Sequence, residues 1–304
     1  MQSFLNAISL LPKGYKDVFS KIPENIAKEL KELRFRVGEP VTLNGNGIYF
    51  ITPNGTVTAS CVDNLLKTDE IDMHEIVFSL SRKSLHTYQD MIARGYIPLR
   101  GGCKAGVAGR AVVKNNTVYS VSAFNSVNIR IAREYEGCAS ELLKSVEGCC
   151  SYLIIGPPMS GKTTLLRELC RYYSGKNSIK PYKTAVIDER DEIASRSFGC
   201  YIDVGVHTDV LTLYPKAVGT EIALRTLSPD IIVLDEIGTE EESKALLSGM
   251  NSGVNFIATA HGSSIEEVLR RPNVKTLVNA GVFKKAVVLS GKDSPCGIKG
   301  VVSF

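Results

Sequence analysis

Residues 152–164 of this 304-residue chain read YLIIGPPMSGKTT, and this stretch decides the fold. Its first four residues are apolar or aromatic, as in a buried strand, and two prolines and two glycines lie among the next six residues. A helical pattern, TTLLRELCRYY, then begins at Thr163 with apolar residues spaced as on one buried face. Gly156, Gly161, Lys162 and Thr163 therefore match G-x-x-x-x-G-K-[ST], with a strand before the pattern and a helix after it.

This pattern predicts a loop that binds the phosphates of a nucleotide. Glycines let backbone N–H groups converge on phosphate oxygens, and the helix N-terminus adds a partial positive charge. We expect Lys162 to reach the β- and γ-phosphates and the Thr163 hydroxyl to bind Mg²⁺. The alternative, a turn without a ligand, is disfavoured by the strand and helix on either side. The residues expected to hold the nucleotide are Gly156, Pro157, Pro158, Met159, Ser160, Gly161, Lys162, Thr163 and Thr164.

The composition is that of a globular protein, with 44% hydrophobic and 22% charged residues. The net charge of +4 is mild and the basic residues are scattered, which argues against a dedicated duplex-DNA binder. The eight cysteines have no zinc-binding spacing, so we expect reduced thiols. The sequence has neither a signal-peptide pattern nor a run of about 18 apolar residues. We therefore expect a cytoplasmic protein that does not span a membrane by itself.

The chain is long enough for two domains. From residue 151 to 304, apolar strands at 152–155, 184–188, 230–235, 255–260 and 284–290 alternate with helical segments. This alternation predicts an α/β domain with a mostly parallel sheet covered by helices on both faces. Residues 136–150 are expected to form a linker with a short helix.

Residues 1–135 are expected to form a smaller α+β domain. Ile26, Leu30 and Leu33 have helical spacing and predict a helix over 24–33. Residues 71–95 predict one or two further helices that end at Gly95. Residues 96–102, 103–113 and 117–132 predict strands of an antiparallel meander, with a turn at Asn115-Asn116.

Carboxylates follow two of the predicted parallel strands. Asp235 and Glu236 come directly after the apolar residues 231–234, and because ligands gather at the carboxyl ends of parallel strands, they should face the phosphate loop. We expect Asp235 to hold Mg²⁺ and Glu236 to polarise the attacking water. Asp188 and Glu189 end the strand at 184–188 and are also placed for the site. The next acids, Asp191 and Glu192, fit the alternative of a helix N-terminus, which favours acidic residues.

One histidine also ends a predicted strand. His261 follows the strand at 255–260, where a neutral imidazole can sense the γ-phosphate or position water. The alternative is a histidine with a purely structural role.

These elements together resemble a known family. The ordered set GPPMSGKTT, VIDERDEI, LRTLSPDIIVLDEIG and TAHG is similar to the Walker A, aspartate-box, Walker B and histidine-box elements of the type II and type IV secretion (traffic) ATPases. More narrowly, ELRFRVGEP, GGCKAGVAGR, NIRIARE and VIDERDEIA resemble the stage III sporulation protein AA family of spore-forming bacteria. The resemblance implies a RecA-like P-loop NTPase domain behind a smaller N-terminal α+β domain, with ATP and Mg²⁺ as ligands and a hexameric ring as the assembly.

The resemblance also implies roles for particular residues. Glu189 matches the aspartate-box glutamate and His261 the histidine-box residue. Arg225 matches an arginine that precedes Walker B, and Arg130 matches one that approaches phosphate from the N-terminal domain. Each arginine has the alternative of a surface salt bridge.

The chain departs from the family pattern at one point. Many traffic ATPases lack the Walker B aspartate, whereas this chain has both Asp235 and Glu236. Glu189 and Glu236 therefore remain rival candidates for the catalytic base, and we favour Glu236.

The resemblance finally implies a place in the cell. The ATPase would act in the cytoplasm of the mother cell, held at the membrane by an anchored partner protein, and would energise a channel complex between mother cell and forespore. One alternative is a nucleic-acid-dependent ATPase, but the mild charge and the lack of a basic, aromatic stripe argue against a specific nucleic acid. Another is a non-hydrolysing nucleotide switch, against which the intact Thr163, Asp235 and Glu236 argue.

Overall fold

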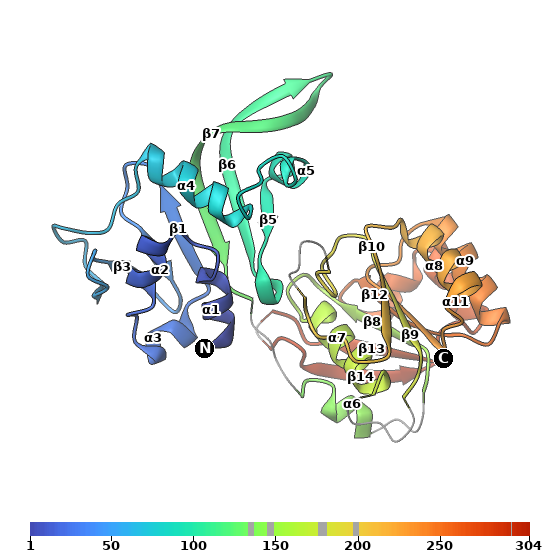
Figure 1. Cartoon of the computed structure of the whole chain (residues 1–304). Helices are drawn as coiled ribbons and strands as arrows, with labels where there is room; N and C mark the ends of the chain where they lie inside the picture. The colour runs from blue at the N-terminus through green and yellow to red at the C-terminus, as the bar shows by residue number, and fades with distance from the viewer. Residues whose placement is uncertain (133–136, 145–148, 176–180, 197–200, 293) are drawn as a thin grey trace. The chain divides into compact units, whose positions relative to one another are not determined.

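The computed structural model describes residues 1–132, 137–144, 149–175, 181–196, 201–292 and 294–304. These residues form two compact units, one made of the residues up to 132 and the other of those from 137 onward (Figure 1). Within these ranges, no helix combines the length and apolar character that crossing a membrane requires.

The first unit is built on an antiparallel sheet. Its strand order is β4-β3-β2-β1-β7-β6-β5, so the central strands β1 and β7 come from opposite ends of the unit's sequence. A two-residue turn with positive φ at Asn115 and Asn116 joins β6 to β7, as expected for a tight hairpin. The strands are β1 (Glu32–Arg36), β2 (Thr42–Asn44), β3 (Ile48–Ile51), β4 (Val57–Thr58), β5 (Tyr96–Pro98), β6 (Lys104–Lys114) and β7 (Thr117–Arg130).

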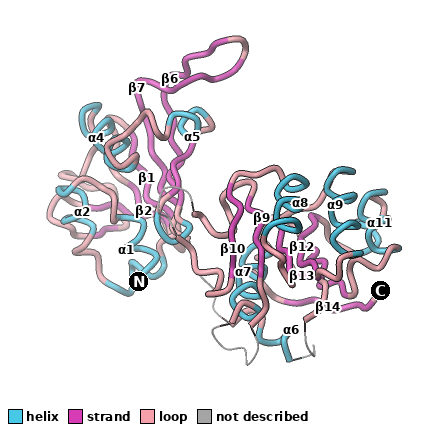
Figure 2. Tube along the Cα trace, turned by 45° about the vertical axis from the view of Figure 1, so that its right-hand side comes forward, coloured by secondary structure: helices cyan, strands magenta, loops and turns pink. Residues whose placement is uncertain are grey.

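Short helices complete this unit (Figure 2). One continuous core joins helix residues such as Phe19 and Met73 to the inward-facing strand residues Leu33, Phe35 and Ile129. The predicted α+β meander is thus confirmed, with two helices in the segment 71–95. The helices are α1 (Gln2–Ile8), α2 (Lys13–Phe19), α3 (Glu24–Glu29), α4 (Glu70–Leu80), α5 (Gln89–Ala93) and the 3₁₀ turn η1 (Arg100–Gly102).

The prediction of a helix over 24–33 is wrong in its second half. Helix α3 ends at Glu29, because Leu30 takes an extended conformation with ψ of 136°. Leu33 instead lies in β1, where it and Phe35 point into the core and their neighbours do not. Leu33 satisfies helical spacing from Leu30 and strand alternation with Phe35 equally well. The pairing of β1 with β2 and β7 decides for the strand.

The second unit is built on a sheet in the order β10-β9-β11-β12-β8-β13-β14. Neighbours are parallel except for β14, which pairs antiparallel with β13 at the edge. The five predicted strands are confirmed, and β10 and β14 are additional. The strands are β8 (Tyr152–Gly156), β9 (Thr184–Asp188), β10 (Thr208–Thr212), β11 (Ile231–Leu234), β12 (Asn255–His261), β13 (Lys285–Leu289) and β14 (Ile298–Ser303).

Both faces of this sheet are covered, as predicted. Successive residues of β8 alternate between two cores: Leu153 and Ile155 belong to one, Tyr152 and Ile154 to the other. Helix α7 packs on the second core, and α8, α9 and α11 contribute to the first. The helices are α6 (Ser140–Lys144), α7 (Lys162–Tyr173), α8 (Lys216–Thr226), α9 (Glu240–Asn251), α10 (Ile265–Leu269) and α11 (Pro272–Asn279).

The described part of the predicted linker packs on this second unit. Ala139 and Leu142, at and beside α6, are buried in the core that contains Tyr152. The Glu168 carboxylate of α7 accepts hydrogen bonds from the N–H groups of Gly137 and Ala139, each at 3.0 Å. Residues 133–136 and 145–148 lie outside the described residues.

Candidate nucleotide-binding site

The loop between β8 and α7 has the backbone that its glycines predict. Gly161 immediately precedes the helix with φ of 91°, and a Cβ there would lie 2.5 Å from the Cys296 sulfur. A Cβ on Gly156 would collide with the Ser160 hydroxyl. The Ser160 hydroxyl is buried and has no hydrogen-bond partner in the described structure, while Met159 at the loop tip is exposed. Both glycines are therefore required by close packing.

Lys162 bends back over this loop. Its Nζ donates to the carbonyl oxygens of Gly156 at 2.8 Å and Pro157 at 3.0 Å. Burial lowers the pKa of this ammonium from its ordinary value, although the nearby Asp235 and Glu236 carboxylates act in the opposite direction. The half-buried charge is thus held at the mouth of the loop by groups that a phosphate can replace.

Thr163 and Asp235 meet although they are far apart in the sequence. The Thr163 hydroxyl donates to Asp235 Oδ2 at 3.2 Å, and the Thr259 hydroxyl donates to Asp235 Oδ1. Strand β12 lies between β8 and β11, so Thr259 reaches Asp235 from the neighbouring strand. The Glu236 N–H donates to the same Thr259 hydroxyl at 2.8 Å. Thr259 therefore fixes both carboxylate residues relative to the sheet.

This donor set fits Mg²⁺. Mg²⁺ prefers oxygen ligands and is usually held by one or two protein groups together with phosphates and water. The Thr163 hydroxyl and the Asp235 carboxylate are two such oxygens, in contact with each other and beside the phosphate loop. The described residues contain no cluster of three or more His, Cys, Asp or Glu that could hold a metal alone.

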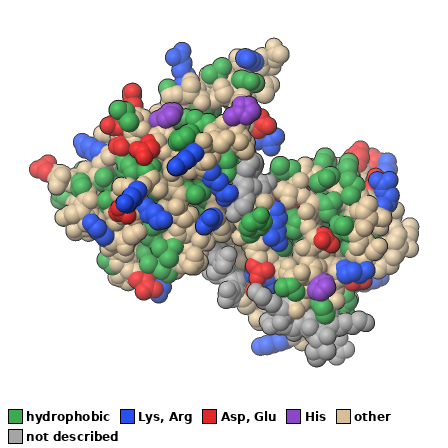
Figure 3. All heavy atoms as spheres, viewed as in Figure 1, with side chains coloured by type: hydrophobic (Ala, Val, Ile, Leu, Met, Phe, Trp, Pro, Cys, Tyr) green, Lys and Arg blue, Asp and Glu red, His purple; other side chains and the backbone are tan. Residues whose placement is uncertain are grey.

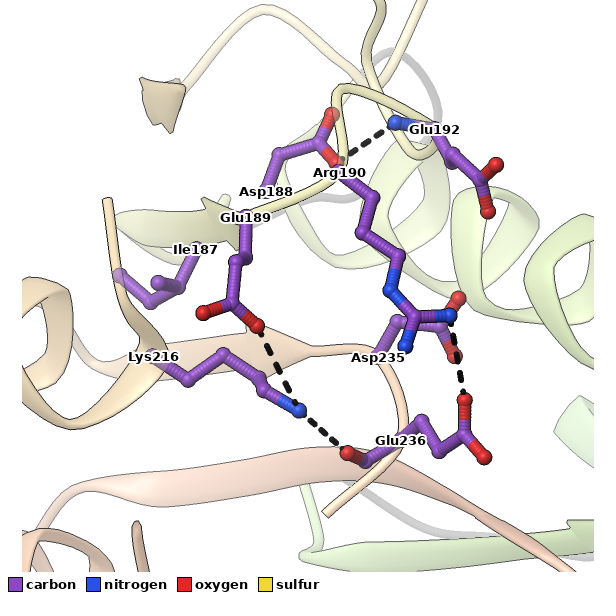
Figure 4. Close-up of a pocket in the computed structure, with 8 residues that line it drawn as sticks. All are labelled: Ile187, Asp188, Glu189, Arg190, Glu192, Lys216, Asp235 and Glu236. Carbon is purple, nitrogen blue, oxygen red and sulfur yellow. Dashed lines mark hydrogen bonds and ion pairs between the residues drawn. The ribbon is translucent and has the colours of Figure 1, made fainter. Parts of the chain in front are cut away.

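A buried lysine organises the neighbouring acids (Figure 4). Lys216 Nζ lies 3.0 Å from Glu242 Oε1 and 3.8 Å from Glu189 Oε2, and it donates to the backbone oxygen of Glu236. Its side chain is only 11% exposed. Sequence reasoning missed Lys216, but a signal was present: the lysine begins a helix, where a positive charge opposes the macrodipole.

Arg190 is a second charge that sequence reasoning missed. Its guanidinium lies 3.5 Å from Glu236 Oε2, but its side chain is 71% exposed. An ion pair this exposed contributes little to stability. Arg190 nevertheless places a positive charge at the pocket, beside Glu236, the favoured candidate base. The residues that line this pocket are Ile187, Asp188, Glu189, Arg190, Glu192, Lys216, Asp235 and Glu236.

The Asp188 side chain bonds to the backbone of the loop that follows β9. Its buried carboxylate accepts hydrogen bonds from the N–H groups of Glu192 (2.8 Å), Ile193 (3.0 Å) and Ala194 (2.8 Å). These bonds hold the turn that carries Glu189 at the rim of the pocket. The described residues 189–196 form turns and bends, not the helix that Asp191 and Glu192 suggested, and Asp191 has a positive φ.

His261 lies where the sequence places it, at the end of β12. In the parallel register it is opposite Gly156, the first residue of the phosphate loop. Its backbone oxygen accepts from the Arg271 guanidinium, a contact that sequence reasoning also missed. The imidazole is thus carried on a backbone that is tied to the loop.

Of the two predicted arginines, Arg225 lies in the same unit as this site but away from it, and Arg130 belongs to the other unit. Arg225 is exposed in the last turn of α8, nine residues beyond Lys216 and hence about 13 Å away along the helix axis. Arg130 ends β7 in the first unit, where its Nε lies 3.8 Å from Glu32 Oε1 and its side chain is 73% exposed.

The fold is that of the secretion ATPases: a RecA-like P-loop NTPase domain with a smaller N-terminal α+β domain. The ATPase DotB of Legionella pneumophila has a TM-score of 0.54 at 14% identity over 91% of this chain and 77% of its own. The pilus retraction motor PilT, solved with bound ADP, has a TM-score of 0.57 at 15% identity over 87% of this chain and 75% of its own.

The chain belongs to the family of sporulation stage III, protein AA, whose family model matches residues 7–303. It is 38% identical over 296 residues to the stage III sporulation protein AA of Bacillus subtilis (strain 168). That match covers 94% of this chain and 91% of the relative.

Proposed function

We propose that the chain is a Mg²⁺-dependent ATPase and that it forms a ring-shaped motor in sporulating cells. The observation that carries the proposal is the meeting of Thr163 and Asp235 at 3.2 Å beside Lys162. A helix N-terminus, an ammonium and two oxygen ligands at one edge of a parallel sheet suit a magnesium–triphosphate pair. The fold shared with secretion ATPases supports the same reading.

The residues divide the work according to their positions. Lys162 would exchange the carbonyls of Gly156 and Pro157 for phosphate oxygens, and Thr163 and Asp235 would hold Mg²⁺. The metal, when bound, neutralises charge on the phosphates and orients them. Glu236 would accept a proton from the attacking water, with Glu189 as the rival base.

Two further groups would keep Glu236 in place. Thr259 accepts from its N–H, and Lys216 donates to its backbone oxygen. Glu236 has a positive φ of 46°, a conformation that costs energy for a residue other than glycine. These contacts hold that conformation and so aim the carboxylate toward the pocket. His261 would lie beside the γ-phosphate.

The assembly and cellular role are also proposals. Arg130 and Arg225 are both exposed, which suits contribution of a guanidinium to a neighbouring subunit's phosphate in a hexameric ring. The family and the motor PilT among its structural neighbours support a role in energising a membrane channel complex between mother cell and forespore. A membrane-anchored partner would hold the ring at the mother-cell side, in the cytoplasm.

Steady-state phosphate release by the full chain with Mg·ATP tests the catalytic part. We expect Lys162→Ala to abolish binding and turnover, whereas Glu236→Gln should bind ATP and release phosphate at least 100-fold more slowly. Glu240→Gln, an exposed acid on α9, is the control and should behave as wild type. If Glu189→Gln loses turnover and Glu236→Gln does not, the catalytic base is Glu189 and not Glu236. A wild-type chain that binds ATP without hydrolysis would instead be a nucleotide switch.

A further inference from the structure

The β6–β7 hairpin projects from the first unit as an arm (Figures 1 and 2). Strand β5 pairs with β6 only as far as Gly106, and β1 pairs with β7 only as far as Ser126. Beyond these points the two strands pair with each other, with their register interrupted between Ala108 and Arg110. From Gly106 to the turn the arm extends about 27 Å, at about 3.4 Å per residue. We refer to residues 109–122 as the distal arm.

The distal arm carries apolar side chains that the unit does not bury. Every residue from Arg110 to Tyr119 is exposed. Val113 is 57% exposed and Tyr119 is 51% exposed, with Val112 and Val118 at 38% each. Val113 and Val118 are also cross-strand partners. The arm touches α5 where Gln89 Nε2 donates to the Tyr119 backbone oxygen at 3.3 Å, and the Lys114 ammonium lies 4.1 Å from the centre of the Tyr119 ring. The β-branched and aromatic side chains that stay exposed near the tip of this hairpin indicate a surface that contacts something else.

The arm belongs to a positively charged segment of the chain, and two of that segment's basic residues, Arg110 and Lys114, lie in the distal arm itself. Between Asp90 and Glu134 the sequence contains no acidic residue. Removing this segment's basic residues from the chain's 36 Lys and Arg leaves 29 against 32 Asp and Glu, so the remainder is net acidic. Figure 3 shows basic and hydrophobic side chains on the visible face of the arm. The seven basic residues are Arg94, Arg100, Lys104, Arg110, Lys114, Arg130 and Arg133.

We propose that the distal arm binds the surface of an anionic phospholipid membrane. Valines and Tyr119 would enter the interfacial layer, where aromatic rings with a polar end are favoured, while Arg110 and Lys114 pair with lipid phosphates. The arm would stay in that layer, because its unpaired strand edges carry backbone groups that cannot enter hydrocarbon unsatisfied. A nucleic acid fits less well, because Tyr119 is the sole aromatic residue of the distal arm and single strands bind through several stacked bases.

This inference does not depend on ATP hydrolysis, so its test uses no nucleotide. The full chain is sedimented with vesicles of equimolar phosphatidylglycerol and phosphatidylcholine, or of phosphatidylcholine alone. We expect at least tenfold tighter binding to the anionic vesicles. Arg110→Gln with Lys114→Gln should weaken it at least tenfold, at about fivefold per charge. Lys13→Gln with Lys16→Gln removes the same charge from exposed positions on α2 and should stay within twofold.

A tryptophan reporter locates the contact. The chain has no tryptophan, so Tyr119→Trp introduces a single one at an exposed position. Its emission should shift to the blue with anionic vesicles and be quenched by brominated lipid, whereas that of Ile48→Trp on β3 should not change. The proposal fails if neither vesicle binds, if both bind equally, if the two charge variants weaken alike, or if Trp emission at 119 is unchanged. It fails equally if single-stranded DNA or polyglutamate binds the arm and vesicles do not.

Discussion

Lys216 Nζ lies 3.0 Å from the Glu242 carboxylate, and the two side chains are almost completely buried together. Glu242 also accepts hydrogen bonds from the N–H groups of Gly238 (2.7 Å) and Thr239 (3.1 Å), the two residues that precede α9. Through this pair the first turns of α8 and α9 are joined directly behind Glu236. Separating an ion pair buried to this extent would leave an uncompensated charge in the interior, which is costly, so the pair restrains the groups beside it.

Replacing Lys216 by Met should therefore destabilise the chain by about 3–5 kcal/mol, because it leaves the Glu242 carboxylate buried without its cation. Turnover should fall at least tenfold, since Glu236 loses the donor to its backbone oxygen. Denaturant unfolding and phosphate release measure the two effects. The double variant Lys216→Met with Glu242→Gln should lose less stability than the sum of the single losses. Additive losses would mean that the pair is not coupled.

Thr259→Val should slow hydrolysis about 10- to 100-fold while leaving the dissociation constant of ATP nearly unchanged. The substitution keeps the shape of the side chain but removes the hydroxyl that bonds Asp235 and the Glu236 N–H. Stability should fall by about 1–3 kcal/mol, because buried polar groups lose their partner. Thr259→Ser restores the hydroxyl and should recover most of the rate. A wild-type rate in Thr259→Val together with a slow rate in Thr259→Ser would show that packing, not the hydroxyl, is what matters.

Gly161→Ala should abolish nucleotide binding. The alanine would need a left-handed backbone, at about 1–2 kcal/mol, and its Cβ would also strike Cys296. Gly253→Ala is the matched control, because Gly253 has φ of +80° with open space around it. It should show the backbone cost alone in thermal unfolding and should bind ATP as wild type. Equal ATP binding by the two variants would contradict the account of the loop.

Glu168→Gln should lower stability by about 1–2 kcal/mol at neutral pH, because the carboxylate anchors Gly137 and Ala139. Burial raises the pKa of Glu168, but the hydrogen bonds from Ala139 and Gly137 together with the nearby Arg171 guanidinium outweigh it, and the net pKa lies below the ordinary 4.5. A depressed folded pKa means that the contribution is complete above pH about 4.5 and is lost as the pH falls through the folded pKa.

Chemical unfolding of wild type and Glu168→Gln across this pH range measures the effect. The gap between the two should be constant at neutral pH and should close in acid. Glu141→Gln, at an exposed position on α6, should show a difference within about 0.5 kcal/mol at every pH. A gap that persists unchanged into acid would rule out the charge as its source.

The fold could be predicted where burial left an unambiguous pattern. Strands β8, β9 and β11 are buried along their whole length and read as apolar runs between turns. Strand β14 escaped because it is an edge strand with mostly exposed residues, and its pairing with β13 is antiparallel. The error at Leu33 has a different source, since its spacing fits a helix and a strand alike and only long-range pairing distinguishes them.

In the candidate site, too, some residues could be predicted from local sequence patterns and others depend on tertiary packing. Lys162 and Asp235 could be placed together from the sequence because each follows a recognisable strand. The carboxyl ends of parallel strands lie at the same edge of the sheet, whatever the order of the strands. Thr259 could not, because its role depends on β12 lying between β8 and β11. The position of Lys216 at the start of a helix was a local signal, but its partners Glu242 and Glu189 follow only from tertiary packing.

The most direct test of the central claim is a crystal structure of the full chain grown with Mn²⁺ and a non-hydrolysable ATP analogue. We expect the phosphates along residues 156–164, with Lys162 Nζ moved from the loop carbonyls to phosphate oxygen. The anomalous signal of the metal should lie between the Thr163 hydroxyl and the Asp235 carboxylate. An empty loop at saturating analogue, with Lys162 still bonded to Gly156 and Pro157, would contradict the account.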